Sequence, residues 1–279
     1  MEYKLKRIKR RRVIPGFPLS MGITLAMVSM IVLIPMASII VCASDLSIQE
    51  FIQIVTAKDV VSGYVVSFSC ALIAAIINCI FGVILAWVLV RYEFPGKRIL
   101  DGLIELPFAL PTAVAGISLT ALYSDQGWIG SIFAKFGIKI AYTKVGITIA
   151  MIFIGIPFVV RAIQPVLEKF DKQYEEAAAM LGANGSKTFF RVIFPEILPA
   201  MLTGFGLALA RGIGEYGSVV FIAGNIPYKT QIAPLLIMSK LEQLKYADAT
   251  AIALVMLVVS FLILLMLNII QVHSTKRTT

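Results

Sequence analysis

The sequence predicts an all-α integral membrane protein with six transmembrane helices. Of its 279 residues, 59% are hydrophobic and only 15% are charged, and the mean hydropathy is +0.90. A soluble domain is about 45–50% apolar and about 25% charged, so lipid is needed to cover the excess apolar surface. The apolar residues also fall into separate stretches of about 20 residues, the length that crosses the hydrocarbon core as a helix.

Six apolar stretches are long enough to span a bilayer, and we expect each of them to be helical. The third contains Pro107 and Pro111, and the fifth is rich in glycine, so these two are the least regular. Membrane helices tolerate such breaks when neighbouring groups satisfy the backbone. In chain order, the predicted spans are residues 17–42, 64–90, 103–123, 145–163, 200–223 and 249–271.

A basic segment, residues 1–16, precedes the first predicted span, residues 17–42. A signal peptide has the same order of basic and apolar regions, but its apolar part is only about 7–15 residues long. We therefore expect an uncleaved first helix, with the basic segment held at anionic lipid headgroups. This arrangement accounts for much of the net charge of +9 without a nucleic-acid partner.

The placement of lysine and arginine predicts the orientation in the membrane. With the N-terminus inside, the inner segments hold the basic N-terminal cluster and most of the other basic residues that lie outside the spans. The positive-inside rule then places both termini, including the tail at residues 271–279, in the cytoplasm.

The cysteines and the histidine give no pattern typical of a metal site or a disulfide framework. Cys42, Cys70 and Cys79 are odd in number and lie in or beside apolar segments, and His273 lies in the tail. A membrane-embedded enzyme would also need a constellation of catalytic groups, and no paired carboxylates occur in an apolar span. We expect neither a metal nor a catalytic site.

Residues 171–199, between the fourth and fifth spans, are too polar to cross a membrane and too long for a minimal turn. We expect a cytoplasmic helix-turn-helix there. The run that starts at Glu176 consists of strong helix formers, Gly182 should end this helix, and Ser186 should cap the next one. Two prolines then lead into the fifth span. Taken alone, the segment is equally consistent with an ordinary amphipathic connector.

The spacing within this segment resembles the EAA loop of ABC importer permeases. It reads Glu176-Ala177-Ala178, three residues, Gly182, nine residues, then Val192-Ile193-Phe194-Pro195. Val192 stands where isoleucine is common in the family, and Phe194 where leucine is common. The resemblance covers about residues 60–270 and implies a type-I ABC importer (MetI-like) permease core with a cytoplasmic coupling helix that fits a groove on the ATPase. The residues it assigns to ATPase coupling are Glu176, Ala177, Ala178, Gly182, Val192 and Pro195.

Two glycine motifs imitate nucleotide sites, and both lack the context that such sites need. Residues 212–217 match GxGxxG, but we expect them inside an apolar helix rather than after a strand. Residues 182–188 imitate a phosphate loop without the glycine that directly precedes its lysine. We therefore expect the chain to hold no cofactor and to depend on a partner that binds ATP.

The fifth span also carries ionisable residues, which we regard as a candidate anion pathway. Arg211 and Glu215 are four residues apart, and each ion costs roughly 2.5–3.5 kcal/mol at a membrane helix centre, so both should pair or reach a water-filled cavity. Mutual pairing explains much of their presence. In the functional alternative, Arg211 attracts an anion, Glu215 keeps the site weak, and Thr112 and Ser218 offer hydroxyls. Glu105 is expected to be an interfacial or interhelical partner instead.

A stripe of small residues runs along the same span. It consists of Gly206, Ala210, Gly214 and Ser218, each four positions apart. Such a stripe lies on one helix face and allows another helix to approach closely. We expect static packing there, with a moving seam along the pathway as the alternative.

Three segments closely resemble the sulfate/thiosulfate permease family, T-type subunit. They are residues 106–116, 211–218 and 221–230. Molybdate permeases share a similar Gly-Glu-aromatic-Gly stretch, and Tyr216, Ser218 and residues 228–230 favour sulfate.

The resemblance implies a non-catalytic subunit in a bacterial-type plasma (inner) membrane. Its implied partners are a second, W-type permease subunit, ABC ATPase subunits and an extracytoplasmic sulfate-binding protein. The alternatives are a molybdate/tungstate permease and an ion-coupled secondary transporter.

Overall fold

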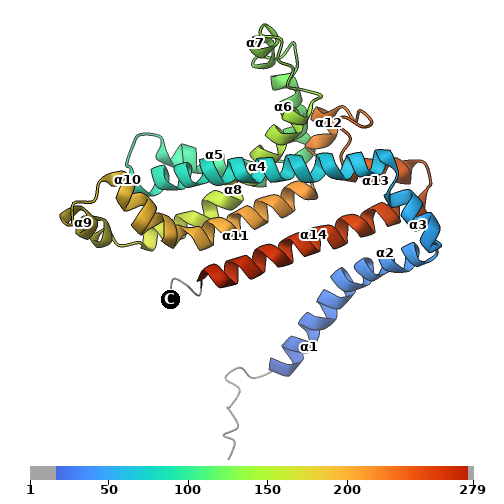
Figure 1. Cartoon of the computed structure of the whole chain (residues 1–279), viewed down its shortest axis with the longest axis horizontal. Helices are drawn as coiled ribbons and strands as arrows, with labels where there is room; N and C mark the ends of the chain where they lie inside the picture. The colour runs from blue at the N-terminus through green and yellow to red at the C-terminus, as the bar shows by residue number, and fades with distance from the viewer. Residues whose placement is uncertain (1–16, 276–279) are drawn as a thin grey trace, which may run out of the picture.

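The computed structural model describes residues 17–275, and within them every regular element is a helix. The predicted basic segment 1–16 and residues 276–279 lie outside the described residues. The helices α4 (Lys58–Arg91), α8 (Lys144–Lys169) and α11 (Phe194–Ile213) pack against one another and form the centre of the fold. Helix α14 (Tyr246–Thr275) lies along α11 and extends into the predicted tail (Figure 1).

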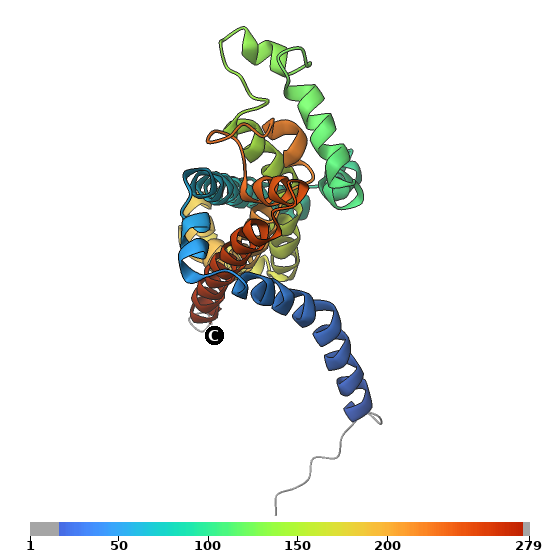
Figure 2. The same ribbon diagram turned by 90° about the vertical axis from the view of Figure 1, so that its right-hand side faces the viewer.

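Five helices of the described residues are long and apolar enough to span a membrane. They are Leu19–Ser44, Lys58–Arg91, Lys144–Lys169, Gly185–Ile213 and Tyr246–Gln271. The first comprises α1 (Phe17–Val28), the π-helical turn η1 (Ser29–Leu33) and α2 (Ile34–Ser44). None of its most apolar part is buried within the chain, and Figure 2 shows it curving away from the other helices.

The predicted third span, residues 103–123, is bent sharply instead of straight. Helices α5 (Lys97–Ala109) and α6 (Thr112–Tyr123) meet at an angle of 114°. Pro111 disfavours helical backbone at the residue before it, and Leu110 is accordingly extended, with ψ of 135°. As a result, α6 points away from the bundle axis (Figure 1).

The predicted fifth span, residues 200–223, is shifted toward the N-terminus. One continuous helix runs from Gly185 to Ile213 through α10 (Gly185–Thr188), the π-helical turn η2 (Phe189–Ile193) and α11. The helix continues through the two prolines that lead into it: Pro195 falls in the first turn of α11, directly after the π-helical turn, where its missing N–H is tolerated, and Pro199 lies inside the helix. The helix ends instead at Gly214, and α12 (Val219–Ala223) follows as a separate short helix.

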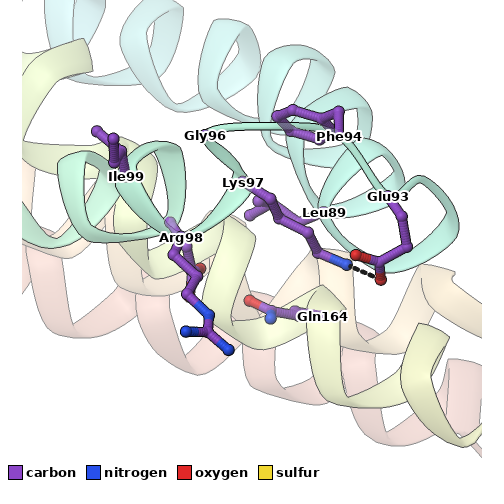
Figure 3. A pocket seen from close by; sticks show the side chains of 9 residues that line it. Leu89, Glu93, Phe94, Gly96, Lys97, Arg98, Ile99 and Gln164 are labelled. Atoms are coloured by element: carbon purple, nitrogen blue, oxygen red, sulfur yellow. Dashed lines mark hydrogen bonds and ion pairs between the residues drawn. The ribbon is translucent and has the colours of Figure 1, made fainter.

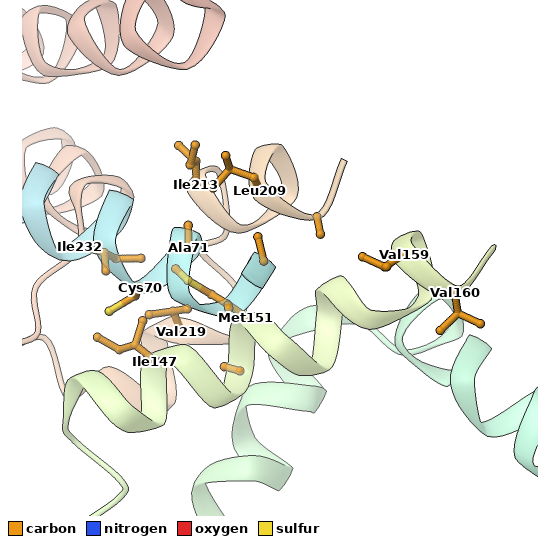
Figure 4. Packing of buried hydrophobic residues seen from close by; sticks show 14 of the residues in the cluster. Cys70, Ala71, Ile147, Met151, Val159, Val160, Leu209, Ile213, Val219 and Ile232 are labelled. Atoms are coloured by element: carbon orange, nitrogen blue, oxygen red, sulfur yellow. The ribbon is translucent and has the colours of Figure 1, made fainter. Parts of the chain in front are cut away.

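The three central helices approach one another at glycines. A Cβ added to Gly204 of α11 would lie 2.7 Å from the Cα of Val159 in α8, and one on Gly82 of α4 would lie 2.9 Å from the Cβ of the same valine. A Cβ on Gly212 would lie 3.2 Å from the Cβ of Ala71 in α4. Around these contacts, buried aliphatic side chains of all three helices fill the interior (Figure 4).

These glycines are not the small residues of the predicted stripe. Gly214 and Ser218 lie beyond the end of α11, so they cannot continue one helix face. A Cβ on Gly206 would meet only the Leu267 side chain, at 3.9 Å. The small residues that α11 buries are Gly204, Ala208 and Gly212, which also lie four positions apart. The predicted spacing was right, but the face was wrong.

The segment predicted as helix-turn-helix begins with α9 (Gln173–Met180), which ends at Gly182 as expected. Gly182 has φ of +80°, a left-handed conformation that costs glycine little. The N–H groups of Gly182 and Ala183 donate to the carbonyl oxygens of Ala179 and Ala178, as in a Schellman motif. The sequence therefore determines this helix end locally.

The cap of the next helix, α10, differs from the prediction. Asn184 is the N-cap in place of Ser186, and its Oδ1 accepts a hydrogen bond from the Lys187 N–H at 2.9 Å. Asparagine and serine are similarly good N-caps, so the sequence alone did not distinguish the two positions.

The opposite end of the bundle carries the short helices α3 (Ile48–Val55) and α13 (Ala233–Glu242) (Figure 1). A capping box begins α3: the Glu50 N–H donates to the Ser47 Oγ, and the Ser47 N–H donates to the Glu50 carboxylate. Hydrogen bonds from the Ser47 hydroxyl and backbone hold the pKa of Glu50 below its ordinary value.

We expect Gly204→Ala to destabilise the detergent-purified protein by about 1–3 kcal/mol, because the new methyl group presses on the backbone of Val159. Gly206→Ala is the matched control: the same helix receives the same change in open space, and higher helix propensity adds up to about 1 kcal/mol of stability. Thermal unfolding followed by circular dichroism measures both. Equal shifts for the two variants would contradict the close contact.

Candidate functional site

The predicted coupling residues of α9 lie on an exposed helix. None of its residues is buried, and Glu176, Ala177 and Gly182 are exposed. At its end, Met180 and Leu181 are 90% and 89% exposed. The prediction missed these two side chains, although two large apolar residues directly before the helix-ending glycine were visible in the sequence. An apolar tip on a polar loop is typical of a surface that another protein covers.

Val192 and Pro195, also predicted to couple, lie on the helix that follows the loop and not on α9 itself. Val192 belongs to η2 and lines a cavity of about 710 Å³ together with Tyr174 and Glu196. Pro195 is exposed in the first turn of α11. The predicted set therefore divides into an exposed group and a group at the junction with the spanning helix.

A second cavity, of about 510 Å³, lies beside the α4–α5 loop. Lys97, Arg98 and Gln164 line it, and Lys97 pairs with Glu93 at 2.7 Å (Figure 3). The α4–α5 loop lies at the same end of the bundle as α9 (Figure 1), so Lys97 and Arg98 belong to that end as well.

The candidate pathway residues meet at the turn that follows α11. Arg211 forms an ion pair with Glu215 across the end of the helix. Glu215 is only 1% exposed, and its second carboxylate oxygen accepts a hydrogen bond from the Ser218 N–H at 2.8 Å. Arg211 keeps 35% of its side chain exposed. The predicted pairing is confirmed, whereas the role in anion handling stays a prediction.

Helix α6 packs directly on this turn. A Cβ on Gly217 would collide with the side chain of Thr112, and one on Gly116 would collide with the backbone of Ser218. Ser218 is fully buried, and its Oγ has no hydrogen-bond partner among residues 17–275. A buried hydroxyl of this kind costs free energy unless another polar group reaches it. All four candidates thus lie in one contiguous cluster.

The cluster lies well within the length of the spanning helices. Gly212 contacts Ala71, which is 13 residues after the start of α4 at Lys58 and 20 residues before its end at Arg91. With 1.5 Å of rise per residue, these intervals are about 20 Å and about 30 Å. The ion pair therefore lies well inside the bundle, nearer the end opposite α9.

Glu105 lies outside this cluster. It pairs with Arg161 of α8 at 2.7 Å, and the same arginine also pairs with Asp101 at 2.7 Å. The predicted role of Glu105 as an interhelical partner is confirmed, because these contacts join α5 to α8.

The GxGxxG motif at residues 212–217 was expected inside an apolar helix, and the structure shows that this expectation is wrong. The motif spans the end of α11 and the turn after it, because the helix stops at Ile213. The residues described contain no strand that could precede it, so the nucleotide-binding context is missing there.

Several helices long enough to span a membrane, an ion pair whose carboxylate is buried among them and an exposed loop helix at one end are the features of a membrane transport component. Residues 78–279 match the family of binding-protein-dependent transport system inner membrane components, and the chain belongs to that family. The predicted ABC importer permease, with its all-α fold, is thereby confirmed.

Curated relatives are similar over nearly the whole chain. It is 45% identical over 270 residues to the sulfate transport system permease protein CysT of Escherichia coli (strain K12), covering 97% of this chain and 98% of the relative. It is 52% identical over 249 residues to the probable sulfate transport system permease protein cysT of Chlorokybus atmophyticus, covering 89% and 87%.

Solved structures support the fold. A bacterial ABC transporter involved in the import of alginate has a TM-score of 0.76 at 13% identity, covering 92% of this chain and 96% of that chain. The MetNI methionine ABC transporter in an inward-facing conformation has a TM-score of 0.58 at 13% identity, covering 77% and 95%.

We expect Glu215→Ala to destabilise the protein more than Glu215→Gln. Alanine leaves the Ser218 N–H without an acceptor and the partly exposed Arg211 without its ion-pair partner, so its cost should exceed the about 1–3 kcal/mol of a single buried unsatisfied group. Glutamine keeps an acceptor for the Ser218 N–H, so its cost is nearer about 1–3 kcal/mol. Thermal unfolding in detergent measures the order, and equal loss in both variants would argue against the pairing.

Proposed function

We propose that this chain is the T-type permease subunit of an ABC importer for sulfate and thiosulfate. The observation that carries the proposal is the 45% identity, over 97% of the chain, to a relative named as a sulfate transport permease. In this proposal it works in the plasma membrane with a W-type permease subunit, ATPase subunits that bind ATP and an extracytoplasmic sulfate-binding protein.

We place the α9 end in the cytoplasm, and with it both termini. Basic residues at the helix ends and loops there support this orientation through the positive-inside rule. They are Arg91, Lys97, Arg98, Lys169, Lys172, Lys187 and Arg191. The C-terminal part of α14 runs along α11 toward that end, and the Gln271 amide donates to the Thr203 hydroxyl of α11 at 2.6 Å.

In this function α9 is the helix on which the ATPase acts. Its exposed apolar end, Met180 and Leu181, supplies the contact area, and Glu176 remains exposed for a charged partner. The helix from Gly185 to Ile213 has 29 residues and a length of about 43 Å. It connects the α9 loop to the last helical turn before Glu215, so a displacement of the loop reaches the polar cluster through one helix.

The polar cluster handles the anion weakly. The Arg211 guanidinium offers paired donors that suit a tetrahedral oxyanion, and the N-terminal turn of α6, which begins at Thr112, adds positive potential. Glu215 weakens the attraction of an anion to this site, because its carboxylate already forms an ion pair with the guanidinium. An anion must therefore compete with a built-in carboxylate, which favours brief occupancy and release. High-affinity recognition then belongs to the external binding protein.

Reconstitution in proteoliposomes tests the function. We expect ATP hydrolysis by the complete complex to be stimulated by sulfate only when the sulfate-binding protein is present. If molybdate stimulated ATP hydrolysis and sulfate did not, the transported anion would be molybdate instead of sulfate. Sulfate uptake by the purified chain alone, without ATP, would overturn the proposal in favour of a secondary transporter.

In the same vesicles, Arg211→Ala should lower sulfate uptake while the complex still assembles, and Arg211→Lys should lower sulfate uptake less.

We expect Gly182→Leu to abolish association with the ATPase and therefore transport, while membrane insertion is retained. Leucine is strained at φ of +80° and adds bulk to the exposed end of α9. Gly185→Leu is the matched control, because Gly185 has open space around it and no positive φ. Co-purification of the ATPase measures the effect. Normal uptake by the Gly182 variant would count against the coupling role of the loop.

A further inference from the structure

Helix α9 is held to the spanning helices by one polar contact. Glu175, in its first turn, accepts a hydrogen bond and ion pair from Arg91, the last residue of α4, with 2.5 Å between Oε1 and Nη2. Among the described residues, 17–275, it is the one side-chain ion pair or hydrogen bond that joins α9 to a spanning helix. The prediction missed Glu175, because its partner is 84 positions away in the sequence.

The arginine is held rigidly. Its side chain is only 10% exposed, and its guanidinium lies 5.5 Å from the ring centre of Trp87, one turn earlier in α4. Trp87 in turn packs edge-to-face with Phe189 of η2, with 5.7 Å between ring centres. A guanidinium restrained by an aromatic face and low exposure keeps more of its ion-pair energy than a solvent-exposed one.

Behind α9 there is free space. The cavity of about 710 Å³ separates its first turn from the start of α11 and is lined by Lys169, Phe170, Tyr174 and Glu196 among others. None of the residues of α9 is buried, and its first turn packs only lightly, through Tyr174 on Phe170 with 5.4 Å between ring centres. The ion pair at Glu175 is therefore the contact that ties its N-terminal end to α4.

We propose that the Arg91–Glu175 pair is a strut that passes the movement of α9 to α4, in parallel with the covalent route through α10 to α11. The inference rests on the proposed function, in which the ATPase acts on α9. The two routes converge, because α4 and α11 meet again at Ala71 and Gly212, next to the Arg211–Glu215 pair. Arg91 and Glu175 are positioning residues in this scheme, since they touch neither ATP nor the anion.

The test uses Glu175→Gln in the reconstituted complex with ATPase and sulfate-binding protein. We expect the complex to assemble and to hydrolyse ATP at its basal rate, while sulfate uptake per ATP falls by about fivefold, an effect typical of a lost side-chain coupling. The charge swap Arg91→Glu with Glu175→Arg should recover part of the loss, whereas each single reversal should not. Glu93→Gln is the control, because Glu93 has an 88% exposed side chain at the same end and should leave uptake per ATP unchanged.

A second measurement does not depend on the cargo. Spin labels at Gln173 of α9, away from the apolar end that contacts the ATPase, and at Ile80 of α4 occupy exposed positions. Their separation should keep one narrow distribution with and without ATP in the wild type and broaden in Glu175→Gln. The proposed role of the Arg91–Glu175 pair would be overturned by any of three results. These are an unchanged distance distribution in Glu175→Gln, normal sulfate uptake per ATP in that variant, or a charge swap with uptake per ATP as low as in the single variants. Loss of sulfate stimulation in the wild type would overturn the proposed cargo alone.

Discussion

The fold depends on the contact between α8 and α11 at Gly204 and Val159, where almost nothing but backbone separates the two helices. Inside a bilayer, helices gain little from burying apolar side chains that lipid would cover equally well, so their association relies on close packing. Gly82 brings α4 to the same valine from another side. Because three helices meet at one residue, none of them can tilt without displacing the others. The peripheral helix α1–α2, which buries none of its most apolar part, is not under this constraint.

Because of that constraint, the long helix from Gly185 to Ile213 can transmit movement along its length. A helix held firmly near its middle by α8 transmits rotation and sliding from one end to the other instead of bending freely. The π-helical turn η2, the least regular part of this helix, lies between the α9 loop and the packed region. π-helical turns often occur at functional positions. Here the turn lies where the loop joins the bundle, next to the aromatic contact of Phe189 with Trp87.

What the sequence could predict was set by local interactions and by composition. The hydrophobic stretches revealed the spans, and Gly182 revealed the end of α9, because a left-handed residue after a helix depends on its immediate neighbours. The 114° bend at Pro111 and the uninterrupted passage through Pro195 depend on where each proline falls relative to a helix end, so the presence of a proline alone did not reveal which one would break its helix. The pairing of Glu175 with Arg91 and the contact of Thr112 with Gly217 join distant segments, which no spacing rule reveals. The Arg211–Glu215 pair was predictable because four positions separate its members.

The end of α11 shows why that pair persists in an apolar bundle. A lone carboxylate at this depth would be costly, and so would a lone guanidinium, whereas the pair is formally neutral and Glu215 gains a backbone hydrogen bond as well. The negative end of the α11 dipole also favours Arg211 in the last turn and disfavours any free anion nearby. Only a displacement that separates Arg211 from Glu215 leaves the guanidinium available. Since α6 packs on the turn that contains Glu215, and α11 carries Arg211, a relative shift of these two helices is the movement that would open the cluster. The same helix, α11, is the one connected to the α9 loop, so a displacement of that loop reaches the polar cluster through one helix.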